Sequence, residues 1–196
     1  MNDHKGFFAM MARMKYIERW ALMRNSVSEN ICEHSLEVAM LAHGLGIIGR
    51  KRFGKDLSPE RLAMLGMYHD CTEIITGDMP TPVKYANDEL KEAYKAIEDS
   101  AAHRLLEMLP EDLRAEYESY FLPEQITPEE YRYVKAADKL SALIKCIEEE
   151  KTGNQEFRSA KQATYESLQQ MNMPEVTVFC EVFLPESYKT LDELEH

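Results

Sequence analysis

Apolar residues recur at spacings of three and four along most of this chain, and strict alternation is almost absent. The N-terminal segment illustrates the pattern with Phe7, Met10, Met14 and Ile17, which would share one face of a helix. The chain has only 8 Gly and 8 Pro among its 196 residues, which disfavours a turn-rich sandwich. We therefore predict an all-α fold, a single compact multi-helix domain over residues 1–196.

Capping signatures predict where three of the helices begin. They are Asn30 with Glu33, Ser58 with Pro59, and Thr127 with Pro128 and Glu130. The first helix is predicted over residues 5–22, the second begins at Asn30 and the third at Ser58, running toward His69. Further helices are predicted over 88–108, 110–121, 127–153, 154–171 and 174–183, with a loop over 77–82.

The charge of the chain limits its partners. A net charge of −12 repels phosphate polymers and anionic bilayers, so we expect no nucleic-acid polymer and no membrane as partner. A small anionic substrate remains possible, because a bound cation reverses the field within one pocket. The four cysteines lie far apart and form no CxxC pair, as in a reduced cytoplasmic protein.

Four ionisable residues occur in apolar or small-residue segments of separate predicted helices: His34, His69, Asp70 and Asp138. Burying a carboxylate beside Leu and Ala costs several kcal/mol unless a positive group accompanies it. A divalent ion would satisfy all four groups together. Two imidazoles with two carboxylates suit Mn, Fe, Co, Ni or Zn better than Ca or Mg.

Simpler interpretations exist for each of these residues. A lone helical histidine such as His34 is usually a core or surface residue, and Asp138 has Lys135 and Lys139 nearby as ion-pair partners. Helix geometry excludes His43, since nine residues at ~100° each place it on the face opposite His34. The order H … HD … D is what favours a shared metal site.

That order, together with three longer segments, resembles a known family. The segments "RWALMRNSVSENICEHS", "YHDCTEIITGDMPTPVKY" and "VKAADKLSALIKCIEE" are similar to the bacterial 5'-deoxynucleotidases, which are HD-domain metal-dependent phosphohydrolases. The resemblance implies that His34, His69, Asp70 and Asp138 hold one divalent transition metal ion, Co or Mn, with Zn, Ni, Fe and Cu as alternatives. Two-metal members of the superfamily need extra histidines. The resemblance to the 5'-deoxynucleotidases also implies a homodimer.

Two acidic residues near His69 are expected to assist catalysis. Glu73 follows His69 by four residues and would share its face if the helix continued; otherwise it is a solvated glutamate of the last turn. Asp78 lies in the loop that precedes two prolines, where an ordinary turn aspartate is the alternative. The resemblance assigns catalysis to Glu73 and substrate binding to Asp78, Met79, Pro80 and Thr81, with Asp78 also a candidate for proton transfer.

Arg19 and Trp20 are placed at the end of the first predicted helix. Arginine binds phosphate through two parallel hydrogen bonds, whereas the single tryptophan has core packing as its alternative role. By resemblance, Arg19 orients the phosphate, Trp20 lies against the sugar and excludes ribose, and Asp70 and Asp138 also contact substrate. An apolar ring against a 2'-hydroxyl discriminates only about 100-fold.

The sequence therefore predicts a metal-dependent 5'-deoxynucleotidase acting on deoxyribonucleoside 5'-monophosphates, broad for the base and selective against ribonucleotides. One alternative is another HD-domain phosphohydrolase, acting on ribonucleotides, cyclic nucleotides or nucleoside triphosphates. A triphosphatase needs more cations than Lys84 supplies near the motif. The other is a non-catalytic helical interaction module held together by the metal, in which Glu73 would have no role.

Overall fold

The computed structural model describes residues 5–84 and 86–195, and within these ranges the chain is helical without strands. The all-α prediction is confirmed. The α-helices are α1 (Phe7–Met11), α2 (Ile31–Phe53), α3 (Pro59–Tyr68), α4 (Glu73–Thr76), α5 (Thr81–Lys84), α6 (Asp88–Leu106), α7 (Glu111–Phe121), α8 (Pro128–Lys151), α9 (Arg158–Gln170), α10 (Pro174–Val182) and α11 (Leu191–Leu194). Short 3-10 turns cover Ala12–Tyr16, Pro123–Gln125, Gln155–Phe157 and Leu184–Tyr188.

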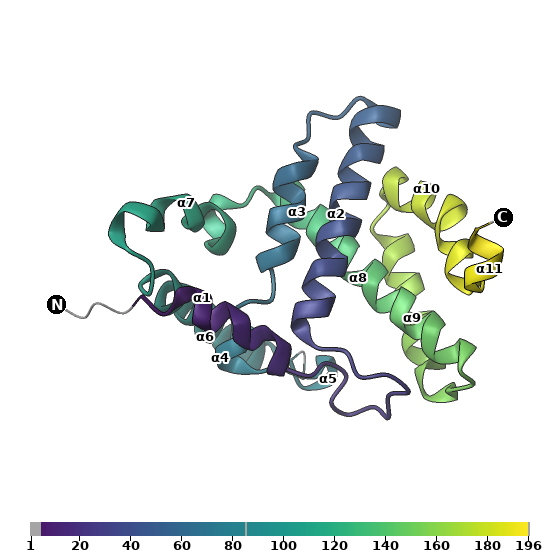
Figure 1. The fold of residues 1–196 in the computed structure, drawn as a ribbon, viewed down its shortest axis with the longest axis horizontal. Helices are drawn as coiled ribbons and strands as arrows, with labels where there is room; N and C mark the ends of the chain where they lie inside the picture. The colour runs from purple at the N-terminus through teal and green to yellow at the C-terminus, as the bar shows by residue number, and fades with distance from the viewer. Residues whose placement is uncertain (1–4, 85, 196) are drawn as a thin grey trace.

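Helices α2, α3 and α8 pack together at the centre of the molecule, with α9 and α10 on one side and α1, α6 and α7 on the other (Figure 1). The central apolar cluster includes Val38, Leu45, Leu65, Leu140 and Ile147. A second cluster joins α1 to α6 and α7 through Phe7, Leu105 and Phe121. By length and composition α2 passes as a membrane span, but more than half of its apolar window is buried inside the protein, as expected for a central core helix.

The predicted helix starts are confirmed by their hydrogen bonds. The Asn30 side chain accepts hydrogen bonds from the backbone N–H groups of Cys32 and Glu33. The Ser58 hydroxyl accepts from Arg61 N, and Thr127 forms a capping box with Glu130. These caps satisfy backbone donors that a helix N-terminus otherwise leaves free.

Helices α2 and α3 approach most closely at Gly66. A Cβ atom added there would lie 3.0 Å from the Cα of Ala39 and 3.1 Å from the C of Val38. Glycine at this position therefore allows the two backbones to touch. The contact brings the end of α3, where His69 follows, close to the first turn of α2 that contains His34.

The first predicted helix was wrong at its C-terminal end. Helical structure stops at Tyr16 rather than at residue 22, and Ile17 is extended. Residues after Tyr16 instead pair with the segment before α2: Glu18 forms an antiparallel bridge with Asn30, and Arg19 N donates to the Glu29 carbonyl at 2.8 Å. Arg19 and Trp20 consequently lie in a loop, and Trp20 adopts a left-handed backbone with φ of 59°.

Candidate metal centre

His34 and Asp138 meet where the first turns of α2 face the middle of α8. His34 is buried, with 1% of the residue exposed, and its Nε2 lies 3.3 Å from Asp138 Oδ1 and 3.5 Å from Asp70 Oδ2. These residues come from three different segments of the chain, as the sequence predicts. Their polar atoms converge on one point at the edge of the helical core.

His69 and Asp70 follow the last residue of α3 instead of continuing the helix, since α3 ends at Tyr68. The Nδ1 of His69 donates to the Gly66 carbonyl at 2.8 Å, and its Nε2 lies 3.0 Å from Asp70 Oδ2. The imidazoles of His34 and His69 are 5.2 Å apart between ring centroids. One ligand atom from each of His34, His69 and Asp70 lies within 4.8 Å of the others.

The hydrogen bonds of the two imidazoles fit a metal site. His69 Nδ1 must be protonated, because its partner is a carbonyl. His34 Nδ1 lies 3.0 Å from the Ser141 hydroxyl, which itself donates to Glu37 Oε2 at 2.5 Å and so accepts from His34. In the neutral imidazoles both lone pairs are therefore on Nε2, the atoms that are buried without a hydrogen-bond partner. This donor set and its tautomers suit a divalent cation.

The charges around these histidines favour a positive group at this point. Burial lowers the pKa of His34, but its contacts with Asp138, Asp70 and Glu29 outweigh burial and raise that pKa to about 10. Burial raises the pKa of Asp138, yet the contact with His34 and the nearby Lys135 bring it well below its usual value. The pKa of Asp70 is also lowered, against burial, by His69 and His34. A bound cation would be stabilised by the same carboxylates that stabilise a proton on His34.

Glu73 lies near the site, but it does not belong to the predicted continuation of the helix that precedes His69. A turn separates it from α3, and it is the first residue of α4. Its side chain is buried, with 5% of the residue exposed, and its Oε2 has no hydrogen-bond partner. Burial, with the charges of Asp70 and Asp78, raises the pKa of Glu73 to about 9. The alternative of a solvated glutamate is therefore wrong.

A cleft of about 800 Å³ opens beside these residues. Its walls come from the loop after Tyr16, the segment from Asp78 to Pro82, α8 and α9. The lining residues include Arg19, Trp20, Asp78, Met79, Pro80, Thr81, Asp138, Lys139, Ala142, Ala160 and Ala163. The structure thus brings together, on one cleft, the predicted substrate-binding residues except Asp70, which instead contacts Arg19.

Arg19 lies between the cleft and the candidate metal centre. Its Nη1 is 3.4 Å from Asp70 Oδ2 and its Nε is 3.5 Å from Glu29 Oε1. The ring of Trp20 packs against Phe157 with centroids 5.3 Å apart, and its Nε1 donates to Glu29 Oε2 at 2.6 Å. Trp20 is half-buried and lines the cleft, so it combines packing with an exposed ring face.

Sequence reasoning missed three residues behind the site: Glu29, Glu37 and Ser141. Glu29 contacts Arg19, Trp20 and the Nδ1 of His34. Its position directly before the predicted cap Asn30 places it at the start of α2, but does not show that Arg19 and Trp20 return to it. Ser141 lies three residues after Asp138 on α8, so helical spacing alone places it on the same face.

The remaining histidines of the described residues do not join His34 and His69. His43 and His103 are exposed, which confirms that His43 faces away from His34. His4 and His196 lie outside the described residues. Lys135 Nζ is 3.4 Å from Asp138 Oδ2, so the surface ion pair considered for Asp138 exists alongside its contact with His34.

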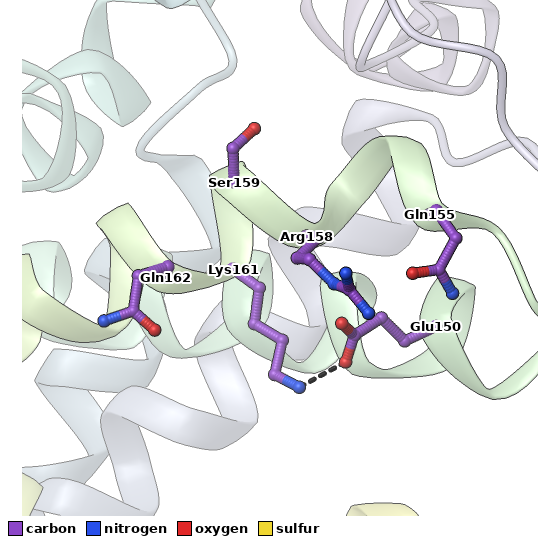
Figure 2. A pocket seen from close by; sticks show the side chains of 6 residues that line it. All are labelled: Glu150, Gln155, Arg158, Ser159, Lys161 and Gln162. Atoms are coloured by element: carbon purple, nitrogen blue, oxygen red, sulfur yellow. Dashed lines mark hydrogen bonds and ion pairs between the residues drawn. The ribbon is translucent and has the colours of Figure 1, made fainter.

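A second, open depression lies at the junction of α8 and α9 (Figure 2). Lys161 forms an ion pair with Glu150 across it, so that cation is already compensated. Ser159 points away from this pair (Figure 2) and also lines the larger cleft. The depression therefore borders the cleft through Ser159, and neither of its cations, Arg158 and Lys161, lines the cleft itself.

Comparison with known proteins identifies the family of this chain. The chain matches the family model described as 5'-deoxynucleotidase YfbR-like over residues 6–187. It is 48% identical to a 5'-deoxynucleotidase of Vibrio cholerae over 188 residues, covering 96% of this chain and 97% of the relative. Against 5'-deoxynucleotidase YfbR of Shigella boydii the identity is 46%, covering 96% and 94% of the two chains.

Solved structures show the same fold at low sequence identity. An HD-domain phosphohydrolase from Listeria innocua superposes with a TM-score of 0.80 and 22% identity, covering 96% of this chain and 91% of its own. The HD phosphohydrolase DatZ of cyanophage S-2L, bound to dA and one catalytic Zn²⁺ ion, gives a TM-score of 0.64 and 23% identity, with coverage of 93% and 96%. With a family model that matches almost the whole chain, this protein belongs to the YfbR-like 5'-deoxynucleotidases and has the HD-domain phosphohydrolase fold.

Proposed function

We propose that this protein is a metal-dependent 5'-deoxynucleotidase that converts deoxyribonucleoside 5'-monophosphates into deoxyribonucleosides and phosphate. The observation that carries the proposal is the pair of buried, unpartnered Nε2 atoms of His34 and His69, which face Asp70 and Asp138 beside the cleft. Family membership supports the substrate class, since the relatives in Vibrio cholerae and Shigella boydii are 5'-deoxynucleotidases.

In this proposal His34, His69, Asp70 and Asp138 hold one divalent transition metal ion. Mixed imidazole and carboxylate ligands suit Co or Mn, and equally admit Zn, Ni, Fe or Cu. When bound, such an ion polarises a phosphoryl oxygen and lowers the pKa of a coordinated water. Hydrogen bonds from Nδ1 to Ser141 and to the Gly66 carbonyl keep both imidazoles oriented toward that ion.

Arg19, Glu73 and Asp78 carry the remaining steps. Arg19 lies at the junction of cleft and metal centre, held by Asp70, where its guanidinium binds and orients the phosphate. Burial and the charges of Asp70 and Asp78 raise the pKa of Glu73 to about 9, which favours its protonated form, so it is able to give a proton to the leaving 5'-oxygen or to orient the attacking water. Asp78 lines the cleft and accepts a hydrogen bond from the 3'-hydroxyl or assists proton transfer.

The walls of the cleft set selectivity. The exposed face of Trp20 lies against the 2'-carbon and leaves no partner for a ribose hydroxyl, while Met79, Pro80 and Thr81 contact the nucleoside. The α9 wall consists of small side chains, Ala160 and Ala163 with the hydroxyl-bearing Ser159 and Thr164, and a hydroxyl both donates and accepts, so it does not select one base edge. We therefore expect all deoxyribonucleoside monophosphates to be substrates.

A panel of nucleotides tests this function directly. Phosphate release is measured for dAMP, dGMP, dCMP, dTMP, AMP, cyclic AMP and dATP, with the purified protein after chelation and after addition of Co²⁺, Mn²⁺ or Zn²⁺. The expected result is turnover of the four deoxyribonucleoside monophosphates only, restored by metal. Turnover that prefers AMP, cyclic AMP or dATP would assign another phosphohydrolase activity to the site.

The assembly and location of the protein complete the proposal. Residues 1–196 act as one domain in a cytoplasmic enzyme, consistent with its four free cysteines and with a net charge of −12 that disfavours polyanionic partners. A homodimer is supported by apolar side chains that remain exposed near both ends of the chain, Phe8, Val182 and Phe183. Light scattering of the purified protein measures its oligomeric state.

A further inference from the structure

Glu29 contacts three groups that belong to different parts of the site. Its Oε2 accepts a hydrogen bond from Trp20 Nε1 at 2.6 Å. Its Oε1 lies 3.5 Å from Arg19 Nε and 3.4 Å from His34 Nδ1. The carboxylate is mostly buried, with 13% of its side chain exposed, and it is absent from the lining of the cleft. Glu29 therefore touches the residues that form the site and does not form the surface itself.

Trp20 depends on such support because its backbone conformation is unfavourable. A φ of 59° is uncommon for a residue with a bulky side chain and costs free energy that neighbouring contacts must offset. The indole has two such contacts in the structure, the hydrogen bond to Glu29 and the packing against Phe157. Phe157 packs against the ring, whereas Glu29 fixes its rotation by accepting from its single N–H group.

Glu29 itself is held in place by the chain around it. Its carbonyl accepts from Arg19 N at 2.8 Å, and Asn30, the next residue, caps α2. On the other side, Ser26 N donates to Glu149 Oε2 at 2.8 Å and the Val27 carbonyl accepts from Lys145 Nζ at 2.6 Å. Both ends of the short segment before α2 are thus anchored, so Glu29 presents its carboxylate from a fixed backbone.

We infer that Glu29 is the positioning residue of the sugar-side wall: by holding the Trp20 indole and the Arg19 guanidinium, it sets the discrimination between deoxyribose and ribose. Its effect on nucleotide selectivity rests on the proposed function, whereas its effect on the orientation of Trp20 does not. A selective wall must be rigid, because a ring free to rotate would make room for the 2'-hydroxyl. The same carboxylate contacts His34, which ties the wall to the candidate metal centre.

The protein offers a direct optical measurement, since Trp20 is its only tryptophan. Replacing Glu29 by leucine (Glu29→Leu) removes the acceptor, so we expect a red shift of the indole emission and at least twofold faster quenching by acrylamide in the protein without nucleotide. Glu29→Gln retains an acceptor oxygen and should stay within about 1.5-fold of the wild-type quenching rate. Glu156→Gln is the control, because Glu156 binds the same loop at Arg24 N without touching Trp20.

Kinetics then test selectivity separately. With Glu29→Leu, the ratio of kcat/KM for dAMP to that for AMP should fall at least fivefold, mainly through a lower KM for AMP, while Glu29→Gln and Glu156→Gln keep the ratio. Trp20→Phe removes the N–H donor and leaves Glu29 in place, so it should lower the same ratio of kcat/KM, and it replaces Glu29→Leu as the test if that variant does not fold.

Unchanged quenching or an unchanged ratio in a folded Glu29→Leu protein would overturn the inference. If wild-type protein hydrolyses neither nucleotide, the proposed function fails and quenching alone decides the role of Glu29 in holding Trp20.

Discussion

Gly66 of α3 lies against the backbone of Ala39 in α2, so closely that a Cβ atom on Gly66 would be 3.0 Å from the Ala39 Cα. Because the Ala39 Cα is a backbone atom, it cannot move aside by a change of side-chain rotamer. The same glycine supplies the carbonyl that accepts from His69 Nδ1. Packing of the two helices and orientation of a candidate metal ligand therefore depend on one residue without a side chain.

Gly66→Ala should lower both stability and metal affinity. Forcing the helices apart costs about 1–3 kcal/mol by overpacking and moves His69 away from His34. Urea denaturation and metal titration measure the two effects. Gly44→Ala is the matched control, since nothing lies within 4 Å of a Cβ there and alanine in a helix interior is about 0.5–1 kcal/mol more favourable than glycine. Equal behaviour of the two variants would contradict the tight contact.

Ser141→Ala should weaken metal binding without unfolding the protein. The hydroxyl accepts from His34 Nδ1 and donates to Glu37, and loss of such an outer contact typically lowers metal affinity about 10-fold or more. Isothermal titration with Co²⁺ or Mn²⁺ gives the affinity. Ser35→Ala serves as control, because that buried serine is adjacent to His34 but its hydroxyl has no hydrogen-bond partner. If both alanine variants bind metal like the wild type, Ser141 does not orient His34.

Glu73→Gln should keep metal and fold yet lose turnover. Burial raises the pKa of Glu73 to about 9, so the neutral amide of glutamine resembles the protonated carboxyl in shape and charge but cannot transfer its proton. We expect kcat to fall by about 100-fold or more, with metal content unchanged in elemental analysis. Asp138→Ala, by contrast, should lose metal and activity together. Normal activity of Glu73→Gln would remove Glu73 from the mechanism, and normal metal content of Asp138→Ala would remove Asp138 from the ligand set.

Trp20→Ala should narrow the difference between dAMP and AMP hydrolysis. Removing the ring opens space beside the 2'-position, so most of a discrimination of about 100-fold should disappear. The measurement is kcat/KM for each nucleotide under saturating metal. Val27→Ala is a suitable control, because Val27 belongs to the same loop but its side chain is exposed and does not line the cleft. A ratio that stays at the wild-type value would leave Trp20 with a packing role only.

Glu149→Gln should destabilise the protein in a pH-dependent manner. Burial raises the pKa of Glu149, but hydrogen bonds from Lys145, Asn154 and Ser26 outweigh it and lower that pKa from 4.5 to about 2. The stabilisation is therefore complete above pH 4.5 and disappears as the pH falls toward 2. At pH 7 we expect the variant to lose about 1–3 kcal/mol of unfolding free energy.

Urea denaturation at pH 7, 5 and 3 tests this expectation as the difference between wild type and variant. This difference in unfolding free energy should shrink at pH 3. Other acid-sensitive groups are present in both proteins, so their contributions cancel in the difference. Glu148→Gln, at the exposed neighbouring position, should show little difference at any pH. A Glu149 effect that is constant from pH 7 to pH 3 would show that the carboxylate charge is not what binds the loop.

Much of the helical fold was predictable because its signals are local. The caps at Asn30, Ser58 and Thr127 bind backbone groups two or three residues away, so sequence spacing suffices to place them. The end of the first helix was not predictable in this way. Apolar spacing continues through Ile17, but that residue accepts a backbone hydrogen bond from Ile31, a contact between segments that no local pattern encodes.

The site shows the same division. Residue types and order identified His34, His69, Asp70 and Asp138, and the structure brings their side chains together. The position of Glu73 was inferred from a helix that actually ends at Tyr68, so the residue is buried near the site for a different reason. Glu29 was missed because its role depends on the turn of the chain that returns Arg19 and Trp20 to the start of α2.

Helix α8 contains Asp138 and Ser141, which face the candidate metal centre, and on its following turns Lys145 and Glu149, which bind the loop over residues 26–27. Lys145 and Glu149 would keep their mutual ion pair if that loop lifted, but they would lose their hydrogen bonds to the Val27 carbonyl and to Ser26 N, and the loss of such bonds opposes the opening. The cleft is thus preshaped where Trp20 lines it, and we expect any widening for product release to involve residues 78–82, which line the cleft without these anchoring contacts.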